Sequence, residues 1–183
     1  PMTILVNIPA YNEAKTIAQV IASLPKKLLG HDVIVQVVDD GSSDDTVKLA
    51  TTAWAKVISH DFNQWVGIAF RTAVQNFLES GADVMVNIDA DGQFDVADIP
   101  WLVEPLLERK ADIVIWSRFG WKDAANMPWI KNFLNRMISS IVWFLMGYKI
   151  DDLTCGFRSY TRESLLRLNL TTSYTYTQET IID

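Results

Sequence analysis

Short apolar runs alternate with amphipathic stretches along this chain. The runs are rich in β-branched residues and mostly apolar on both faces, which predicts covered strands at 3–10, 32–39, 55–61, 83–89 and 112–118. The stretches between them predict helices at 13–24, 44–54, 66–79 and 96–109. This alternation predicts an α/β fold, with a mainly parallel sheet flanked by helices in a single domain over 1–183.

Acidic and polar residues gather where the predicted strands end. The stretch "PAYNE" follows the first strand, "DDGSSDD" the second, "DADGQ" the fourth and "SRFG" the fifth. In parallel sheets, ligands bind beyond the carboxyl ends of the strands. We therefore expect the functional site at this edge of the sheet.

Composition and charge narrow the function classes. The 183 residues are 49% hydrophobic, enough for one sizeable core, and the formal net charge is −6. That charge argues against a general nucleic-acid binder, which needs a basic face to neutralise phosphates. The single cysteine excludes an intrachain disulfide and a thiolate zinc cluster, and it fits a reducing compartment. No basic region precedes a long apolar run at the start, so we expect no signal peptide.

Asp40 is not explained by turn chemistry alone. Gly41 suits a turn with positive φ, and Ser43 or Asp44 suits the cap of the next helix, so 41–45 need no ligand. Asp40 lies ahead of that turn, at the strand end. Because carboxylates are rarely buried unpaired, we expect it to face a partner rich in hydrogen-bond donors, of which a nucleobase is one.

The stretch "DADGQF" has three interpretations. A solvated loop is one. A calcium loop of the EF-hand type is excluded, because its sixth position needs Gly and would hold Phe94 or Val96. In an extended segment, Asp89, Asp91 and Gln93 would project to one side, roughly 7 Å apart. Two carboxylates so close repel unless a cation lies between them, and oxygen ligands suit Mg²⁺ or Mn²⁺.

Other phosphate-binding and catalytic patterns are absent from the sequence. There is no G-x-G-x-x-G after a strand and no P-loop. The two histidines, His31 and His60, pair with no Ser or Cys nucleophile in the pattern, and we interpret both as surface or capping residues.

Five stretches in order, "IPAYNEAKTI", "VVDDGSSDDT", "NIDADGQ", "SRF" and "DLTCGFRSYTRE", resemble the family 2 glycosyltransferases of the GT-A fold. The resemblance is greatest to their polyprenyl-phosphate branch, which includes dolichol-phosphate mannose synthases, and it covers nearly the whole chain. It implies a catalytic domain that binds a nucleotide-sugar, GDP-mannose or a UDP-sugar. The implied donor-binding residues are Pro9, Ala10, Tyr11, Glu13, Val38, Asp40, Asp89, Ala90 and Asp91.

The resemblance also implies a reaction. Asp89, Asp91 and Gln93 would hold Mg²⁺ or Mn²⁺ against the departing diphosphate, with Asp89, Asp91 and Arg118 acting in catalysis. The acceptor would be a polyprenyl (dolichyl-type) phosphate bound near Arg118, Lys131 and Arg136. A largely dianionic phosphate needs no general base, and its attack opposite the diphosphate would invert the anomeric centre.

The segment 126–149 bears on the acceptor. Its apolar run, 137–146, is far below the roughly 20 residues that span a bilayer. It reads equally as a buried core helix or as an interfacial helix bordered by basic residues, which would make the protein peripheral on the cytoplasmic face of a membrane.

Two departures from the family keep alternatives open. Trp65 and Val66 stand where relatives often have Gly and Lys, and the chain stops where relatives continue, so we expect that its C-terminal part is missing. A nucleotide-sugar binding module without transfer activity, or an interaction domain using some of the seven tryptophans, is therefore an alternative to the enzyme.

Overall fold

The computed structural model describes residues 2–117, 155–168, 176, 177 and 180. The chain divides into two compact units, Pro1–Val114 with Gly156–Asp183, and Ile115–Cys155. Nearly all of the described residues belong to the first unit. The segment 126–149, predicted to meet the acceptor or a membrane, lies outside the described residues.

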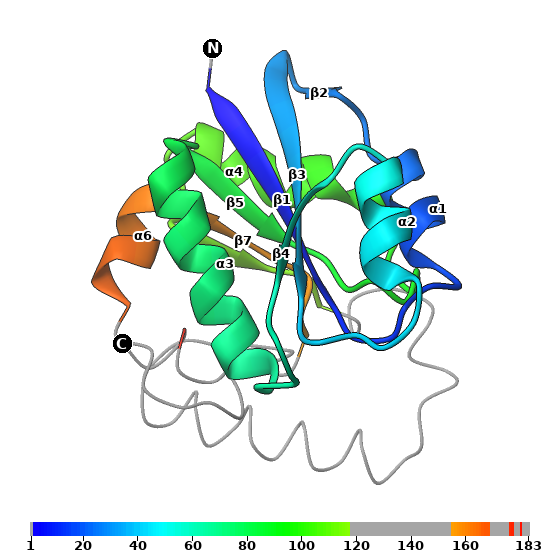
Figure 1. Cartoon of the computed structure of the whole chain (residues 1–183). Helices are drawn as coiled ribbons and strands as arrows, with labels where there is room; N and C mark the ends of the chain where they lie inside the picture. The colour runs from blue at the N-terminus through cyan, green and yellow to red at the C-terminus, as the bar shows by residue number, and fades with distance from the viewer. Residues whose placement is uncertain (1, 118–154, 169–175, 178–179, 181–183) are drawn as a thin grey trace, which may run out of the picture. The chain divides into compact units, whose positions relative to one another are not determined.

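One seven-stranded sheet forms the centre of the first unit (Figure 1). Its path is β2–β3–β1–β5–β7–β6, and β4 pairs with β3 off this path. β1 lies parallel to β3 and β5, and β4 parallel to β3, whereas β2 and β7 run antiparallel to β3 and β5. The strands are β1 Thr3–Ala10, β2 Lys27–Leu28, β3 His31–Asp39, β4 Lys56–Ser59, β5 Val84–Asn87, β6 Ile113–Ile115 and β7 Arg158–Thr161.

The register brings three strand ends to one edge of the sheet. Ala10 of β1 pairs with Asp39 of β3, and Asn7 of β1 pairs with Asn87 of β5. The pairing continues one residue beyond the strands, because the Asp40 N–H donates to the Ala10 carbonyl at 2.9 Å. The loops after β1, β3 and β5 therefore begin side by side.

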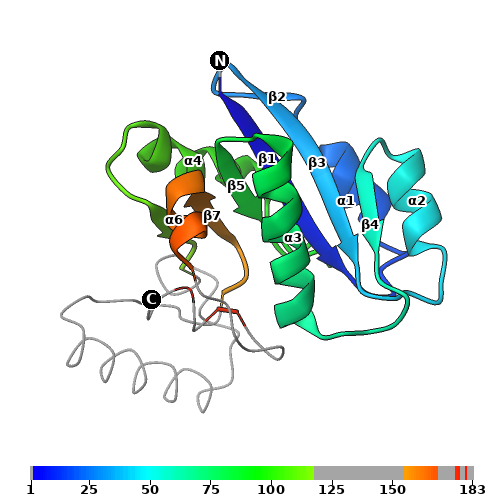
Figure 2. The ribbon, with the colours of Figure 1, turned by 60° about the vertical axis from the view of Figure 1, so that its left-hand side comes forward.

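Helices cover both faces of the sheet (Figure 2). Tyr160 of β7 lies in the apolar cluster of α3, while the neighbouring Ser159 donates to the Leu102 carbonyl of α4 at 2.7 Å. Alternate side chains of a strand point to opposite faces, so α3 and α4 lie on opposite sides. The helices are α1 Ile17–Ser23, α2 Thr46–Thr52, α3 Val66–Ser80, α4 Ile99–Leu107 and α6 Arg162–Arg167, with a 3-10 turn, η1, at Val96–Asp98.

The main core cluster lies between α3 and the sheet. Phe70 stacks on Tyr176, with ring centroids 3.9 Å apart and planes at 11°, and its ring also meets Tyr160 at 5.7 Å. Full burial of such side chains stabilises the fold by roughly 1.5–3 kcal/mol each. The cluster comprises Leu5, Phe70, Val74, Phe77, Ala82, Met85, Tyr160, Leu165 and Tyr176.

The predicted mainly parallel α/β architecture is confirmed, with five strands and four helices in the expected order. The observed elements are mostly shorter than predicted, since the first helix begins at Ile17 after a turn and the fourth begins with η1. β2, β7 and α6 were not predicted. The first is too short for a periodic pattern, and β7, "RSYT", begins with a charged residue.

Candidate functional site

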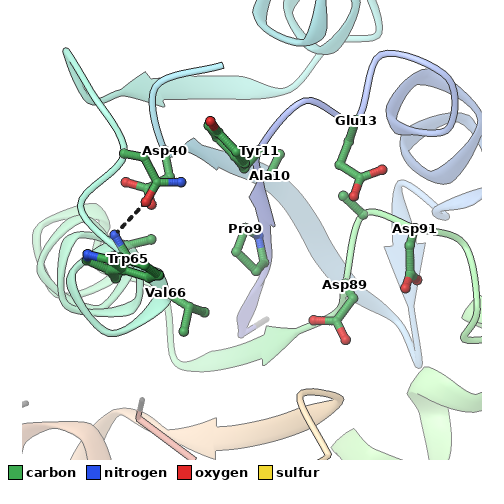
Figure 3. A pocket seen from close by; sticks show the side chains of 12 residues that line it. Pro9, Ala10, Tyr11, Glu13, Asp40, Trp65, Val66, Asp89 and Asp91 are labelled. Carbon is green, nitrogen blue, oxygen red and sulfur yellow. Dashed lines mark hydrogen bonds between the residues drawn. The ribbon is translucent and has the colours of Figure 1, made fainter. Parts of the chain in front are cut away.

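A pocket of about 560 Å³ opens at the carboxyl ends of β1, β3 and β5, beside the start of α3 (Figure 3). This volume is within the range of small-molecule sites. Figure 3 shows Asp40 and Trp65 at one end and Asp89 and Asp91 at the other, with Pro9 between them. The lining residues are Pro9, Ala10, Tyr11, Glu13, Asp40, Asn63, Trp65, Val66, Ala69, Asp89, Ala90 and Asp91.

The loop after β1 is held to the loop after β3 by hydrogen bonds. The Asn12 N–H donates to Ser42 Oγ, and the Ser43 N–H donates to Asn12 Oδ1, both at 2.8 Å. The Glu13 N–H donates to Thr46 Oγ1 at 2.8 Å. These reciprocal bonds fix one wall of the pocket without using the Tyr11 or Glu13 side chains.

The turn predicted after Asp40 is confirmed. Gly41 has φ +78°, and a Cβ there would lie 2.5 Å from the Phe62 carbonyl carbon, so only glycine fits. Asp44 accepts from the N–H of Thr46, the first residue of α2, at 3.0 Å, and from the Ala14 N–H at 3.1 Å. The Thr46 hydroxyl also donates to Asp44 and is the largest cause that lowers the pKa of this carboxyl.

Asp40 is buried and held by two donors from the loop before α3. His60 Nδ1 lies 2.7 Å from Asp40 Oδ1, and the Gln64 N–H donates to the same oxygen at 2.9 Å. Asp40 is therefore paired with donors of the protein itself, and its contact with a nucleobase stays a prediction. The interpretation of His60 as a surface or capping residue is wrong, because its side chain is only 9% exposed and its other nitrogen lies 2.9 Å from Thr72 Oγ1.

The acidic end of the pocket is a turn. The chain turns at Ala90 and Asp91, and Gly92 follows with φ +74°. The extended conformation predicted for this segment is therefore wrong. Asp89 and Asp91 both line the pocket, whereas Gln93 lines a neighbouring hollow beside α1.

The comparisons with known proteins identify the family. The model of Glycosyl transferase family 2 matches residues 5–168. The chain belongs to this family. It is 34% identical over 176 residues to a UDP-N-acetylglucosamine–dolichyl-phosphate N-acetylglucosaminyltransferase of Methanococcus voltae, covering 86% of this chain and 69% of the relative. It is 32% identical over 176 residues to an undecaprenyl-phosphate mannosyltransferase of Micrococcus luteus, covering 92% and 70%.

Solved structures of a third glycosyltransferase share the fold. The glucosyl-3-phosphoglycerate synthase of Mycobacterium tuberculosis, crystallised with Mn²⁺, UDP and glucosyl-3-phosphoglycerate, matches with a TM-score of 0.77 and 25% identity. The match covers 99% of this chain and 64% of that one. The GT-A fold is thereby confirmed. This family 2 domain spans 64% to 70% of the lengths of these three proteins.

Most of the residues predicted to bind the donor lie together in this glycosyltransferase. Val38 is an exception, since it is fully buried and packs with Ala69 and Ala73 of α3. Arg118, Lys131 and Arg136, predicted to meet phosphates, lie outside the described residues. The predicted residues that line the pocket are Pro9, Ala10, Tyr11, Glu13, Asp40, Asp89, Ala90 and Asp91.

The pocket also contains residues that were not predicted as site residues. Asn63, Trp65, Val66 and Ala69 line it, and His60 supports it from behind. Trp65 was already singled out in the sequence, because the family resemblance implies a glycine at its position. Its φ of +75° and ψ of 154° confirm that this position has the backbone conformation of glycine.

The glycosyltransferase pocket fits a divalent cation that keeps open coordination positions. Asp89 and Asp91 supply carboxylate oxygens to one cavity, the donor type that Mg²⁺ and Mn²⁺ prefer. Among the described residues, no three His, Cys, Asp or Glu side chains group closely enough to enclose a metal by themselves. In the same part of the chain, no helix has the length and apolarity to cross a bilayer.

Proposed function

We propose that this domain transfers a sugar from a nucleoside-diphosphate sugar to a polyprenyl phosphate, with the help of Mg²⁺ or Mn²⁺. One observation carries the proposal: a single pocket holds a buried carboxylate suited to a nucleobase, Asp40, and an acidic pair suited to a metal-bound diphosphate, Asp89 and Asp91. A nucleotide-sugar has its base and its diphosphate at two such separate points.

The roles of the residues follow from their places. Asp40 would accept from the base, and Pro9 and Tyr11 would flank the nucleoside between the two ends of the pocket. Asp89 and Asp91 would hold the cation. Gln93 would join them from the neighbouring hollow, which Asp91 also lines. When bound, the cation would supply charge stabilisation for the departing diphosphate.

The acceptor side of the proposal rests on the relatives, whose names state dolichyl-phosphate and undecaprenyl-phosphate acceptors. A phosphate oxygen that attacks opposite the diphosphate would invert the sugar, and it needs no base because it is already ionised. Arg118, Lys131 and Arg136 would meet the phosphates. Since the lipid chain keeps such an acceptor in a membrane, the domain would work at a membrane surface on its cytoplasmic side.

The cation prediction is tested by nucleoside-diphosphate binding. We expect Mn²⁺ to tighten binding of UDP or GDP by about tenfold or more, and Asp91→Asn to remove that gain. Calorimetric titration with Mn²⁺ and with EDTA measures it. Asp95→Asn is the control, because Asp95 is an exposed acid of the same loop outside this pocket and its Oδ1 acceptor for Ala97 is retained.

Transfer itself is tested with the full-length protein, a radiolabelled nucleotide-sugar and a short polyprenyl phosphate in detergent. Metal-dependent lipid labelling supports the enzyme. Nucleotide binding without labelling indicates a binding module instead. Absence of nucleotide binding under both metal conditions contradicts the proposal.

A further inference from the structure

We propose that the pocket selects uridine donors over guanosine donors, and that His60 sets this choice by occupying one oxygen of Asp40. The inference rests on the proposed function, because it names the base of the donor. His60 is a positioning residue in this proposal, since it acts on the base only through Asp40.

Asp40 offers the pocket one oxygen. Both of its protein donors, His60 Nδ1 at 2.7 Å and the Gln64 N–H at 2.9 Å, lie on Oδ1. A carboxylate oxygen has about two lone-pair directions, so Oδ1 is fully used. Within the described residues nothing donates to Oδ2, and Asp40 lines the pocket while being only 5% exposed.

The ring of His60 is fixed from both sides. Its Nε2 lies 2.9 Å from Thr72 Oγ1 of α3, and its backbone N–H donates to the Asp39 carbonyl at 2.9 Å. With a proton on Nδ1, the ring donates to the Asp40 carboxylate, and its Nε2 lies against the Thr72 hydroxyl, which can donate or accept. This arrangement prevents Asp40 Oδ1 from turning toward a ligand.

The two bases differ in how many oxygens they need. Uracil presents one ring N–H between two carbonyls, and Asp40 Oδ2 alone satisfies it. Guanine presents a ring N–H and an amino group side by side, and a carboxylate satisfies both only with both of its oxygens. Because Oδ1 is occupied, guanine would leave a donor unpaired. A buried unpaired donor costs about 1–3 kcal/mol, which corresponds to roughly 5- to 150-fold in affinity.

The aromatic residues at this end of the pocket do not change the choice. Trp65 and Tyr11 are 58% and 49% exposed and line the same cavity. Stacking on an aromatic ring accepts any base, because every base has a π-face. Selection therefore depends on the edge of the base that Asp40 meets.

Asp40→Asn tests the inference, because it is expected to change the preferred base from uracil to cytosine. The amide oxygen stays with the His60 and Gln64 donors, so the amide N–H faces the base. Cytosine has an acceptor at the ring nitrogen where uracil has N–H. We expect Asp40→Asn to weaken UDP binding by about tenfold or more and to bind CDP more tightly than UDP.

A pair of His60 variants tests the positioning role. His60→Ala lets the Asp40 carboxylate rotate, so the affinity ratio of UDP to GDP is expected to fall toward one. His60→Asn retains a donor close to the place of Nδ1 and is expected to keep the wild-type ratio. A purely structural role for His60 would weaken both nucleotides equally and leave the ratio unchanged. Thermal melts confirm that each variant is folded.

The deciding measurement is calorimetric titration of the wild-type chain with UDP and GDP in Mn²⁺. Binding of UDP at least about five times tighter than GDP supports the inference. Equal or tighter binding of GDP overturns it and leaves the proposed function standing. If neither nucleotide binds, the proposed function fails and the inference fails with it.

Discussion

Trp65 has an unusual backbone for a large side chain. Its φ of +75° and ψ of 154° lie in a region that is essentially restricted to glycine, and the residue is 58% exposed where it lines the pocket. Such strain costs about 1–3 kcal/mol and is retained mainly at functional sites. Because Trp65 keeps this conformation and lines the pocket, we expect its ring to serve the pocket.

A pair of substitutions separates the backbone strain from the ring. Trp65→Gly and Trp65→Ala both remove the ring, but only glycine relieves the strain. Glycine also gains entropy in the unfolded chain, so we expect Trp65→Gly to be about 1 kcal/mol more stable than Trp65→Ala. Urea unfolding measures the difference. Equal stability of the two variants would show that position 65 is not strained.

The sequence predicted that Asp40 needs hydrogen-bond donors, but it did not predict which residues supply them. A carboxylate at the end of a buried strand needs donors, and this requirement is visible without a structure. Its protein donors come from His60 and Gln64, which lie 20 and 24 residues further along the chain. Their position depends on how the loop after β4 folds back, and no local pattern encodes that path.

At the scale of elements, the loops after β1 and β3 form one unit that supports the pocket. Asp44 connects them, because it accepts from Ala14 of the first loop and from Thr46 at the start of α2. The parallel register of β1 and β3 places these loops together. The sequence predicted both loops at the correct strand ends, but not the bonds between them.

The connection through Asp44 predicts an acid-sensitive contribution to stability. Donation by Thr46 lowers the folded-state pKa of Asp44 below its usual value of 3.8, so the stabilisation is present above that pH and is lost as the pH falls through the folded pKa. We expect the melting temperatures of wild type and Asp44→Asn to differ most at about pH 6 and to converge as the pH falls through the folded-state pKa of Asp44. A thermal-melt series measures this.

Asp45→Asn is the matched control for that series. It removes the same charge at the neighbouring position, where Asp45 is exposed and its side chain makes no capping hydrogen bond. We expect its difference from wild type to stay nearly constant with pH. A convergence as large as that of Asp44→Asn would assign the effect to net charge instead of to the bonds of Asp44.

At the scale of the whole molecule, a buried chain of amides crosses the sheet. Gln36 of β3 donates to Asn7 of β1 at 3.1 Å, and Asn7 donates to Asn87 of β5 at 2.7 Å. Asn87 then donates to the Gly156 carbonyl and to the Tyr176 hydroxyl, both at 3.0 Å. Three strands are thus joined to the last part of the chain. The sequence shows polar residues inside apolar runs, but their pairing follows only from the sheet register.

This chain of amides places Gly156 against the acidic end of the pocket, although 69 residues separate Gly156 from Asn87. A Cβ at Gly156 would lie 2.8 Å from Asp89 Oδ1 and 3.1 Å from Asp89 Oδ2. The 2.8 Å contact with Oδ1 is shorter than real Cβ contacts, so the Asp89 carboxylate would have to move. Because the carboxylate is the flexible end of a side chain, Gly156→Ala would displace the Asp89 carboxylate and would change the free energy of unfolding only slightly.

Two glycine-to-alanine changes should therefore have opposite signatures. We expect Gly156→Ala to remove about tenfold of the Mn²⁺-dependent gain in UDP binding while changing the free energy of unfolding by less than about 1 kcal/mol. Gly81, at the end of α3, has φ +75° and open space around it, so Gly81→Ala is expected to lose about 1 kcal/mol of stability and to bind UDP normally. Titration and urea unfolding of both variants measure the two effects. Normal Mn²⁺-dependent binding by Gly156→Ala would show that the position of the Asp89 carboxylate does not matter for the cation, and would remove Asp89 from the proposed metal site.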